Sequence, residues 1–275
     1  MLRSVFNFLH DKVEKTSRRR VQTLAADICE SKTGQGFYAW TLNHINSIAF
    51  VSSLPRHVAG TYQSASNRVL LNPKMRQSRL ICTVSHEARH AWQSKTGVMD
   101  FKHLSARENI FLRRVIEADA FSYSFCFGLM HERQTGGIAL LTALKRDTFF
   151  SHLLKVYRQL PDTHRQDIAK VRRAMFDAFF APENPNLALY DAKLNKNKGW
   201  RDRMVKAEDD PKCRKIDFSV LTKIGQMGDM GLPQGNFLTD VPGRDLRDPY
   251  YWQGIDNALL PQPRLKSKSK TRSIF

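Results

Sequence analysis

Residues 86–93 have the sequence HEARHAWQ, and this stretch decides the fold and the chemistry expected of the chain. Apolar side chains recur at helical spacing over residues 78–95, and Gly97 follows just past the expected end of this helix. His86 and His90 then share one face, about 40° apart around the helix axis, with the apolar residues on the opposite side. Both histidines are therefore expected to face away from the core, toward a bound ion or solvent.

The spacing of the two histidines suits one metal ion. Imidazoles four residues apart on a helix can hold the same Zn²⁺, and Glu87 lies beside them, where it can take a proton from zinc-bound water. The alternative is a solvated polar helix face, because the pattern His-Glu-x-x-His also arises by chance. Packing of both histidines into the core fits the helical phase poorly.

A catalytic zinc site needs a third protein ligand and an open fourth position. The downstream candidates are Asp100, His103, Glu108, Glu117 and Asp119. Glu117 is preferred, because it lies in the middle of a second apolar helix, where a carboxylate needs a partner. A buried ion pair of Glu117 with Arg113 or Arg89 is the alternative. Asp119 projects about 200° away from Glu117, so we expect it to form hydrogen bonds behind the ligands.

Three segments in sequence order resemble a known superfamily. They are residues 69–72 (VLLN), which end an extended segment, the HEARHAWQ stretch, and residues 117–120 (EADA). With them the chain resembles a gluzincin metallopeptidase, most closely the bacterial metallopeptidase domain families with these two signatures. The similarity covers about residues 45–135.

The resemblance implies a zincin-like α+β fold, mostly helical, with a small sheet before the metal-binding helix. It implies a zinc-dependent peptidase in which His86, His90 and Glu117 bind the metal and Glu87 is the general base. In zincins the strand before the metal helix is the sheet edge that binds an extended substrate. That role would fall to Arg68, Val69, Leu70 and Leu71.

Two further roles are implied less directly. Many gluzincins support a metal-binding histidine with an Asp four residues after the ligand Glu, where this chain has Phe121. Asp119 is the candidate substitute. An oxyanion-stabilising His or Tyr is usual in relatives, and the candidates are Tyr190, His103, His131 and His152.

One main domain with appendages is expected from 275 residues. Strands are expected within residues 45–54 and 58–71, and later helices at residues 105–133, 138–159, 162–180, 188–205 and 218–224. Gly34 and Gly36 are expected to end a leading helix. The predicted division is an N-terminal helical segment (1–36), the zincin-like domain with its helical extension (37–182), a loop-rich region (183–260) and a basic disordered tail (261–275).

The charge and the cysteines limit the alternatives. The formal net charge is +18, but the basic residues are spread along the chain without interleaved aromatics, so a specific nucleic-acid partner is not expected. The charge is compatible with association with anionic surfaces. Four widely spaced cysteines and no signal peptide or transmembrane stretch favour a cytoplasmic protein, and export as an effector is compatible with them. The expected partner is a peptide or protein substrate.

The alternative function is a non-catalytic binding protein on a zincin scaffold. The intact Glu87 argues against it, because a structural zinc site needs no general base and normally has four protein ligands.

Overall fold

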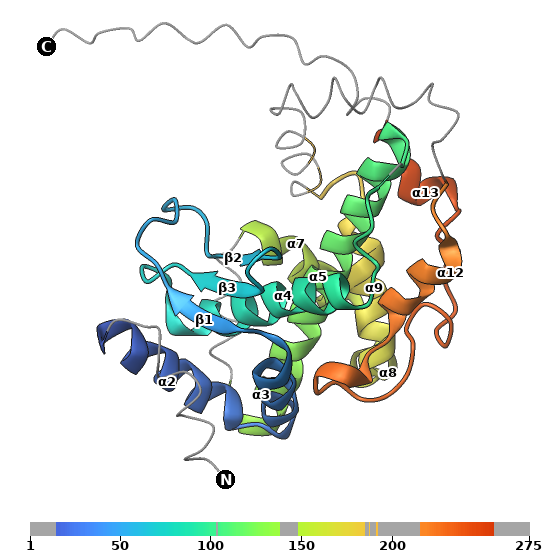
Figure 1. The fold of residues 1–275 in the computed structure, drawn as a ribbon. Helices are drawn as coiled ribbons and strands as arrows, with labels where there is room; N and C mark the ends of the chain where they lie inside the picture. Colours follow the sequence, from blue (N-terminus) through green and yellow to red (C-terminus); the bar gives the residue numbers. More distant parts are fainter. Residues whose placement is uncertain are drawn as a thin grey trace, which may run out of the picture.

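The computed structural model describes residues 15–102, 104–137, 148–184, 187, 191 and 215–255 (Figure 1). In order, the elements are α2 (Lys15–Cys29), α3 (Lys32–His44), β1 (Ser47–Phe50), β2 (Gly60–Gln63), β3 (Arg68–Leu71), α4 (Gln77–Lys95), α5 (Ala106–Thr135), α7 (Thr148–Gln159), α8 (Asp162–Gln166), α9 (Ile168–Phe179), α12 (Phe218–Leu221), η1 (Thr222–Gly225), η2 (Gly228–Met230) and α13 (Pro249–Trp252). This is the expected α+β class, mostly helical with a small sheet before α4.

The sheet has the strand order β1-β3-β2, so β3 lies in the centre. β1 pairs with β3 in parallel, and β2 pairs with β3 in antiparallel fashion through a tight turn in which Asn67 has a positive φ of 49°. Val69 and Leu71 alternate with more exposed neighbours and are completely buried on the face that packs against α4. The expectation that Arg68–Leu71 forms the free edge is therefore wrong, because both sides of β3 are paired.

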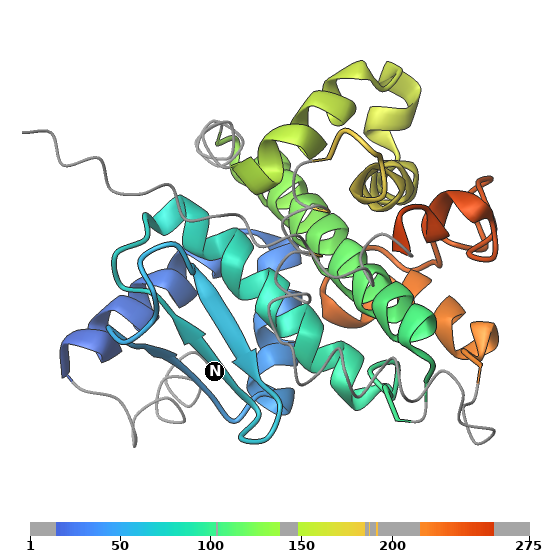
Figure 2. The same ribbon diagram turned by 90° about the horizontal axis from the view of Figure 1, so that it is seen from above.

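Helix α5 is the centre of the fold. Over most of its 30 residues it is buried all around rather than along one stripe, as expected for a helix enclosed by other elements. Figure 2 shows α5 running between two groups of elements, with the sheet, α2 and α4 on one side and α7, α8 and α9 on the other. Ser105 caps its first turn by accepting a hydrogen bond from the backbone N–H of Glu108, as the capping pattern predicts.

Helix α3 was not expected from the sequence. Gly34 and Gly36 lie inside it and do not end a helix, so the predicted boundary at residue 36 falls within α3. The two glycines permit close contacts instead: a Cβ on Gly34 would lie 1.7 Å from the carbonyl oxygen of Ile28, and one on Gly36 would lie 3.0 Å from Cα of Gly231. The expected helix over residues 162–180 is divided into α8 and α9 by Asp167, whose side chain caps α9.

Residues 215–255 are short helices and turns, as the loop-rich composition predicts, but they belong to the main core. Met230, Phe237 and Tyr251 are completely buried and lie in the same hydrophobic cluster as α5. Of the helix expected at residues 138–159, the second part is α7 (Thr148–Gln159), and residues 138–147 lie outside the described residues. The helix expected at 188–205, apart from residue 191, and the basic tail at 261–275 lie outside them as well. No helix in the described ranges combines the length and the apolar character needed to cross a bilayer.

Candidate metal centre

Helices α4 and α5 cross where the three predicted ligands meet. Nε2 of His86 lies 3.1 Å from Nε2 of His90 and 3.5 Å from Oε2 of Glu117. Nε2 of His90 lies 3.7 Å from Oε1 of Glu117, and one ligand atom from each residue falls within 4.8 Å of the others. The side chains are 12%, 12% and 21% exposed, so solvent reaches the group from one side.

Gln93 determines which nitrogen of His90 faces this group. The side-chain nitrogen of Gln93 donates to the carbonyl oxygen of Ile116 over 2.9 Å and to Oδ2 of Asp119 over 2.7 Å, and both of these oxygens can only accept. The amide therefore cannot be reversed, and its oxygen, 2.8 Å from Nδ1 of His90, must accept a hydrogen bond. Nδ1 thus carries the proton, and Nε2 presents a lone pair to the other two side chains.

His86 has different surroundings. Its Nδ1 is buried and forms no hydrogen bond with the described residues. The ring instead packs edge-on against Phe121, with ring centroids 4.5 Å apart. Phe121 stands where many gluzincins have a supporting Asp, so packing rather than a carboxylate orients this imidazole.

The donor set fits a divalent metal ion. Two imidazole nitrogens and one carboxylate converge on one place, and solvent access allows a fourth ligand from outside the chain. Zn²⁺ in catalytic sites takes such a His₂Glu set and an open position. His86, His90 and Glu117 are therefore the residues that could hold a metal.

Glu87 lies beside this group on the sheet side of α4. Its Oε2 accepts a hydrogen bond of 2.8 Å from the backbone N–H of Tyr62 in β2, and the residue is only 9% exposed. Burial is the main cause that raises the pKa of Glu87, to about 7; the charge of Glu117 raises it further, while His90 and the Tyr62 hydrogen bond act in the opposite direction. A carboxyl group with a pKa near neutrality can both accept and return a proton.

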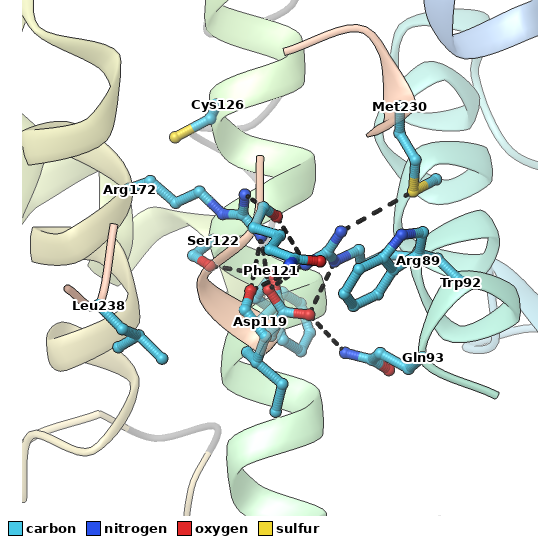
Figure 3. Close-up of polar contacts among 12 residues, drawn as sticks. Arg89, Trp92, Gln93, Asp119, Phe121, Ser122, Cys126, Arg172, Met230 and Leu238 are labelled. Atoms are coloured by element: carbon cyan, nitrogen blue, oxygen red, sulfur yellow. Dashed lines mark hydrogen bonds and ion pairs between the residues drawn. The ribbon is translucent and has the colours of Figure 1, made fainter. Parts of the chain in front are cut away.

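Asp119 turns away from the three predicted ligands, as its helical phase predicts. It is completely buried between Arg89 of α4, at 2.8 Å, and Arg172 of α9, at 2.6 Å (Figure 3). Burial alone would raise the pKa of its carboxyl group, but the two guanidinium charges and the Arg89 and Gln93 hydrogen bonds hold that pKa below its usual range. Asp119 is linked to His90 through the side chain of Gln93. It does not contact His86, so it does not replace the carboxylate that would support this histidine if residue 121 were Asp.

The other candidates are engaged elsewhere. The side chain of Asp100 caps its own turn at Lys102, and that of Glu108 accepts from the backbone N–H of Ile216. Of the oxyanion candidates, His131 bonds to the Ser31 hydroxyl, and His152 lies 3.2 Å from the carbonyl oxygen of Ala178. His103 and Tyr190 lie outside the described residues.

Several contributors to the site were not predicted from the sequence. Gln93 could have been predicted, because it follows His90 by three residues and so lies one helical turn further on the same face. No sequence pattern points to Tyr62 or Arg172, since they act through a strand pairing and a contact between helices that residue spacing does not reveal.

Comparison with known proteins shows similarity to a protein family. The model of a family described as "Putative metallopeptidase family (DUF6782)" matches residues 4–208. No curated protein and no solved structure matches the chain.

Proposed function

The chain belongs to the DUF6782 family, and from that premise we propose that it is a zinc-dependent peptidase with His86, His90 and Glu117 as metal ligands and Glu87 as general base. The observation that carries the proposal is the convergence of the three ligand side chains with a buried carboxyl group directly beside them. A bound Zn²⁺ would supply a Lewis acid that polarises the scissile carbonyl group and lowers the pKa of water.

Glu87 would perform the proton transfers. The backbone N–H of Tyr62 fixes one of its oxygens, which leaves the other free to take a proton from the attacking water. The same carboxyl group would then give the proton to the leaving amine. Its raised pKa suits both steps near neutral pH, because the ionised and the neutral forms are each accessible.

The substrate would lie along β2 rather than β3. The N–H of Tyr62 points away from β3 toward Glu87, so the outward-facing backbone groups of β2 are those of Gly60 and Tyr62. Their carbonyl oxygens can accept hydrogen bonds from an extended peptide, which would add a strand to this edge next to the metal ligands. The peptide backbone would thereby be held parallel to α4.

A second candidate is a non-catalytic binding protein on the same scaffold. The buried Nδ1 of His86 favours it, because a metal-binding histidine usually donates its other ring proton to a partner that strengthens metal binding. Glu87 favours the peptidase, since a binding protein would gain nothing from a buried carboxyl group at this position.

The test is the metal content of purified protein, measured by elemental analysis for the wild type, His86→Ala, Glu117→Ala and the control Asp100→Asn. We expect about one zinc per chain in the wild type and the control and none in the two ligand variants. A mixed-peptide cleavage assay with Glu87→Gln accompanies it, and Glu87→Gln should keep zinc but lose cleavage. Wild type that binds no zinc after reconstitution overturns the peptidase, whereas zinc binding without cleavage supports the binding protein.

A further inference from the structure

A continuous set of polar contacts joins the C-terminal part of the chain to the metal ligand His90. It starts at the backbone carbonyl oxygens of residues 224 and 226, which accept hydrogen bonds from two buried guanidinium groups. Figure 3 shows these groups, of Arg89 and Arg172, meeting the carboxylate of Asp119, which in turn accepts from the side chain of Gln93. Residues 224 and 226 lie beyond the matched residues 4–208. The contacts therefore connect a segment outside the family match to the centre of the proposed site.

The middle of this set is an unbalanced cluster of charges. Asp119, Arg89 and Arg172 are all completely buried, and one carboxylate faces two guanidinium groups. Burial, followed by the charge of Arg89, lowers the pKa of Arg172 to about 10, which still leaves its guanidinium group charged at neutral pH. An uncompensated buried charge is costly, so the second guanidinium group needs further acceptors.

Residues 215–255, which we call the C-terminal segment, supply those acceptors. Arg89 donates to the carbonyl oxygens of Ile224, over 2.9 Å, and Gln226, over 3.1 Å. Arg172 donates to the Gln226 carbonyl over 3.2 Å. Asp119 and one short stretch of backbone thus supply the acceptors for the terminal nitrogens of Arg172 and for Arg89, whereas the buried Nε of Arg172 forms no hydrogen bond with the described residues.

Residues 229 and 230 of the same segment form further hydrogen bonds beside the cluster of Asp119, Arg89 and Arg172. The hydroxyl group of Tyr123 on α5 donates to the carbonyl oxygen of Met230 over 2.7 Å, and the indole of Trp92 on α4 donates to Asp229 over 3.0 Å. The guanidinium group of Arg89 lies 3.7 Å from the Trp92 ring centroid, so ring and charge are packed together. Displacement of this segment would therefore disturb the arginines as well.

We propose that Gln93 is a positioning residue for His90, and that residues 224–230 of the C-terminal segment hold Gln93 in that role through the cluster of Asp119, Arg89 and Arg172. Asp119 fixes the orientation of the Gln93 amide, and the amide oxygen keeps the proton of His90 on Nδ1. Nε2 of His90 is then free to bind a metal. The benefit for zinc affinity rests on the proposed function, whereas the control of the His90 proton does not.

The role of Gln93 is tested with Gln93→Met, which keeps the length of the side chain but removes its three hydrogen bonds, to His90, Ile116 and Asp119. The first measurement is the position of the His90 proton in metal-free protein, by nitrogen NMR at about pH 8, above the pKa of about 6.5 of free histidine. The wild type should carry it on Nδ1, and Gln93→Met should shift it toward Nε2, which free histidine prefers. The second measurement is zinc affinity by competition with a chelator, which should weaken about 10- to 100-fold.

The role of the C-terminal segment is tested with a pair of tyrosine variants. Tyr123→Phe removes the hydrogen bond to Met230 beside the cluster, and Tyr250→Phe removes an equivalent 2.8 Å hydrogen bond from the same segment to the carbonyl oxygen of Asp177. Both should lower Tm, and Tyr123→Phe should lower it more because Tyr123 is completely buried and Tyr250 only partly. Only Tyr123→Phe should weaken zinc binding, by less than Gln93→Met does.

The outcomes separate this inference from the proposed function. A wild type that binds no zinc, but whose His90 proton moves in Gln93→Met, overturns the peptidase and supports the positioning role of Gln93. A wild type that binds zinc, with the His90 proton and the zinc affinity both unchanged in Gln93→Met, overturns that role. Equal loss of zinc affinity in the two tyrosine variants, or none in either, overturns the part assigned to the C-terminal segment.

Discussion

The backbone N–H of Tyr62 donates a 2.8 Å hydrogen bond to Oε2 of Glu87, so the outer strand of the sheet is joined directly to the proposed general base. The bond ties the position of the Glu87 carboxylate to the distance between β2 and α4. That distance is small at Gly60, where a Cβ would lie 2.7 Å from Cγ2 of Thr83 on α4.

Gly60→Ala is therefore expected to push β2 away from α4 and to displace Glu87. We expect peptide cleavage to fall by about tenfold or more, with zinc content unchanged, because small misplacements of a catalytic group are costly. Cleavage assays and elemental analysis of the purified variant check this. Thr83→Ser in the same chain removes the clashing methyl group and should restore part of the activity, whereas Gly137→Ala, where the nearest atom is 3.4 Å away, should change nothing. Full activity in Gly60→Ala would refute the coupling.

Glu87→Gln is expected to change how the stability of metal-free protein depends on pH. The pKa of Glu87 is raised from 4.5 to about 7, so the folded chain favours the neutral carboxyl group. The resulting stabilisation is complete below about pH 4.5 and is lost as the pH rises through 7. It corresponds to about 3 kcal/mol.

Denaturant unfolding at pH 5 and pH 8 measures this effect. The variant should gain stability relative to the wild type as the pH rises, by about 3 kcal/mol over this range. A difference between the two proteins that stays constant with pH would show that Glu87 has an ordinary pKa.

Metal removal should lower the stability of the wild type. A ligand that binds only the folded state stabilises it by about 2.7 kcal/mol at a concentration 100 times its Kd. A chelator is therefore expected to reduce Tm in the wild type and to have no effect on His86→Ala, as scanning calorimetry can show. An equal chelator effect on both proteins would place the metal elsewhere.

The part of the site that depends only on the geometry of single helices was accessible from the sequence. The phase of His86 and His90 and the apolar surroundings of Glu117 needed only helical geometry, and the structure brings the three side chains together. The strand order was not accessible, because the periodicity of β2 and β3 is the same whichever of them is central.

The C-terminal contribution was out of reach for a different reason. Residues 224 and 226 act through backbone carbonyl oxygens, which every residue has, so no side-chain pattern marks them. Helix α3 was missed because Gly34 and Gly36 were interpreted as helix ends, whereas they provide space for close backbone contacts.

Asp119→Ala should be strongly destabilising. It leaves the buried guanidinium groups of Arg89 and Arg172 without their carboxylate, and removal of one partner from a buried ion pair costs about 3–5 kcal/mol. Denaturant unfolding against Asp245→Ala gives the comparison, since Asp245 pairs with Arg247 at the surface, where the loss should be slight. Similar losses in the two variants would mean that the buried cluster contributes little to stability.

The cluster also has a consequence for the order in which the protein matures. Helices α4, α5 and α9 are complete by residue 179, but the backbone acceptors that Arg89 and Arg172 have besides Asp119 come from residues 224 and 226. A ribosome-bound chain therefore carries all three proposed metal ligands well before it carries the groups proposed to hold His90 in place. The proposed peptidase would gain its working geometry only after residue 226 has emerged from the ribosome. Unfinished chains would therefore not yet be active.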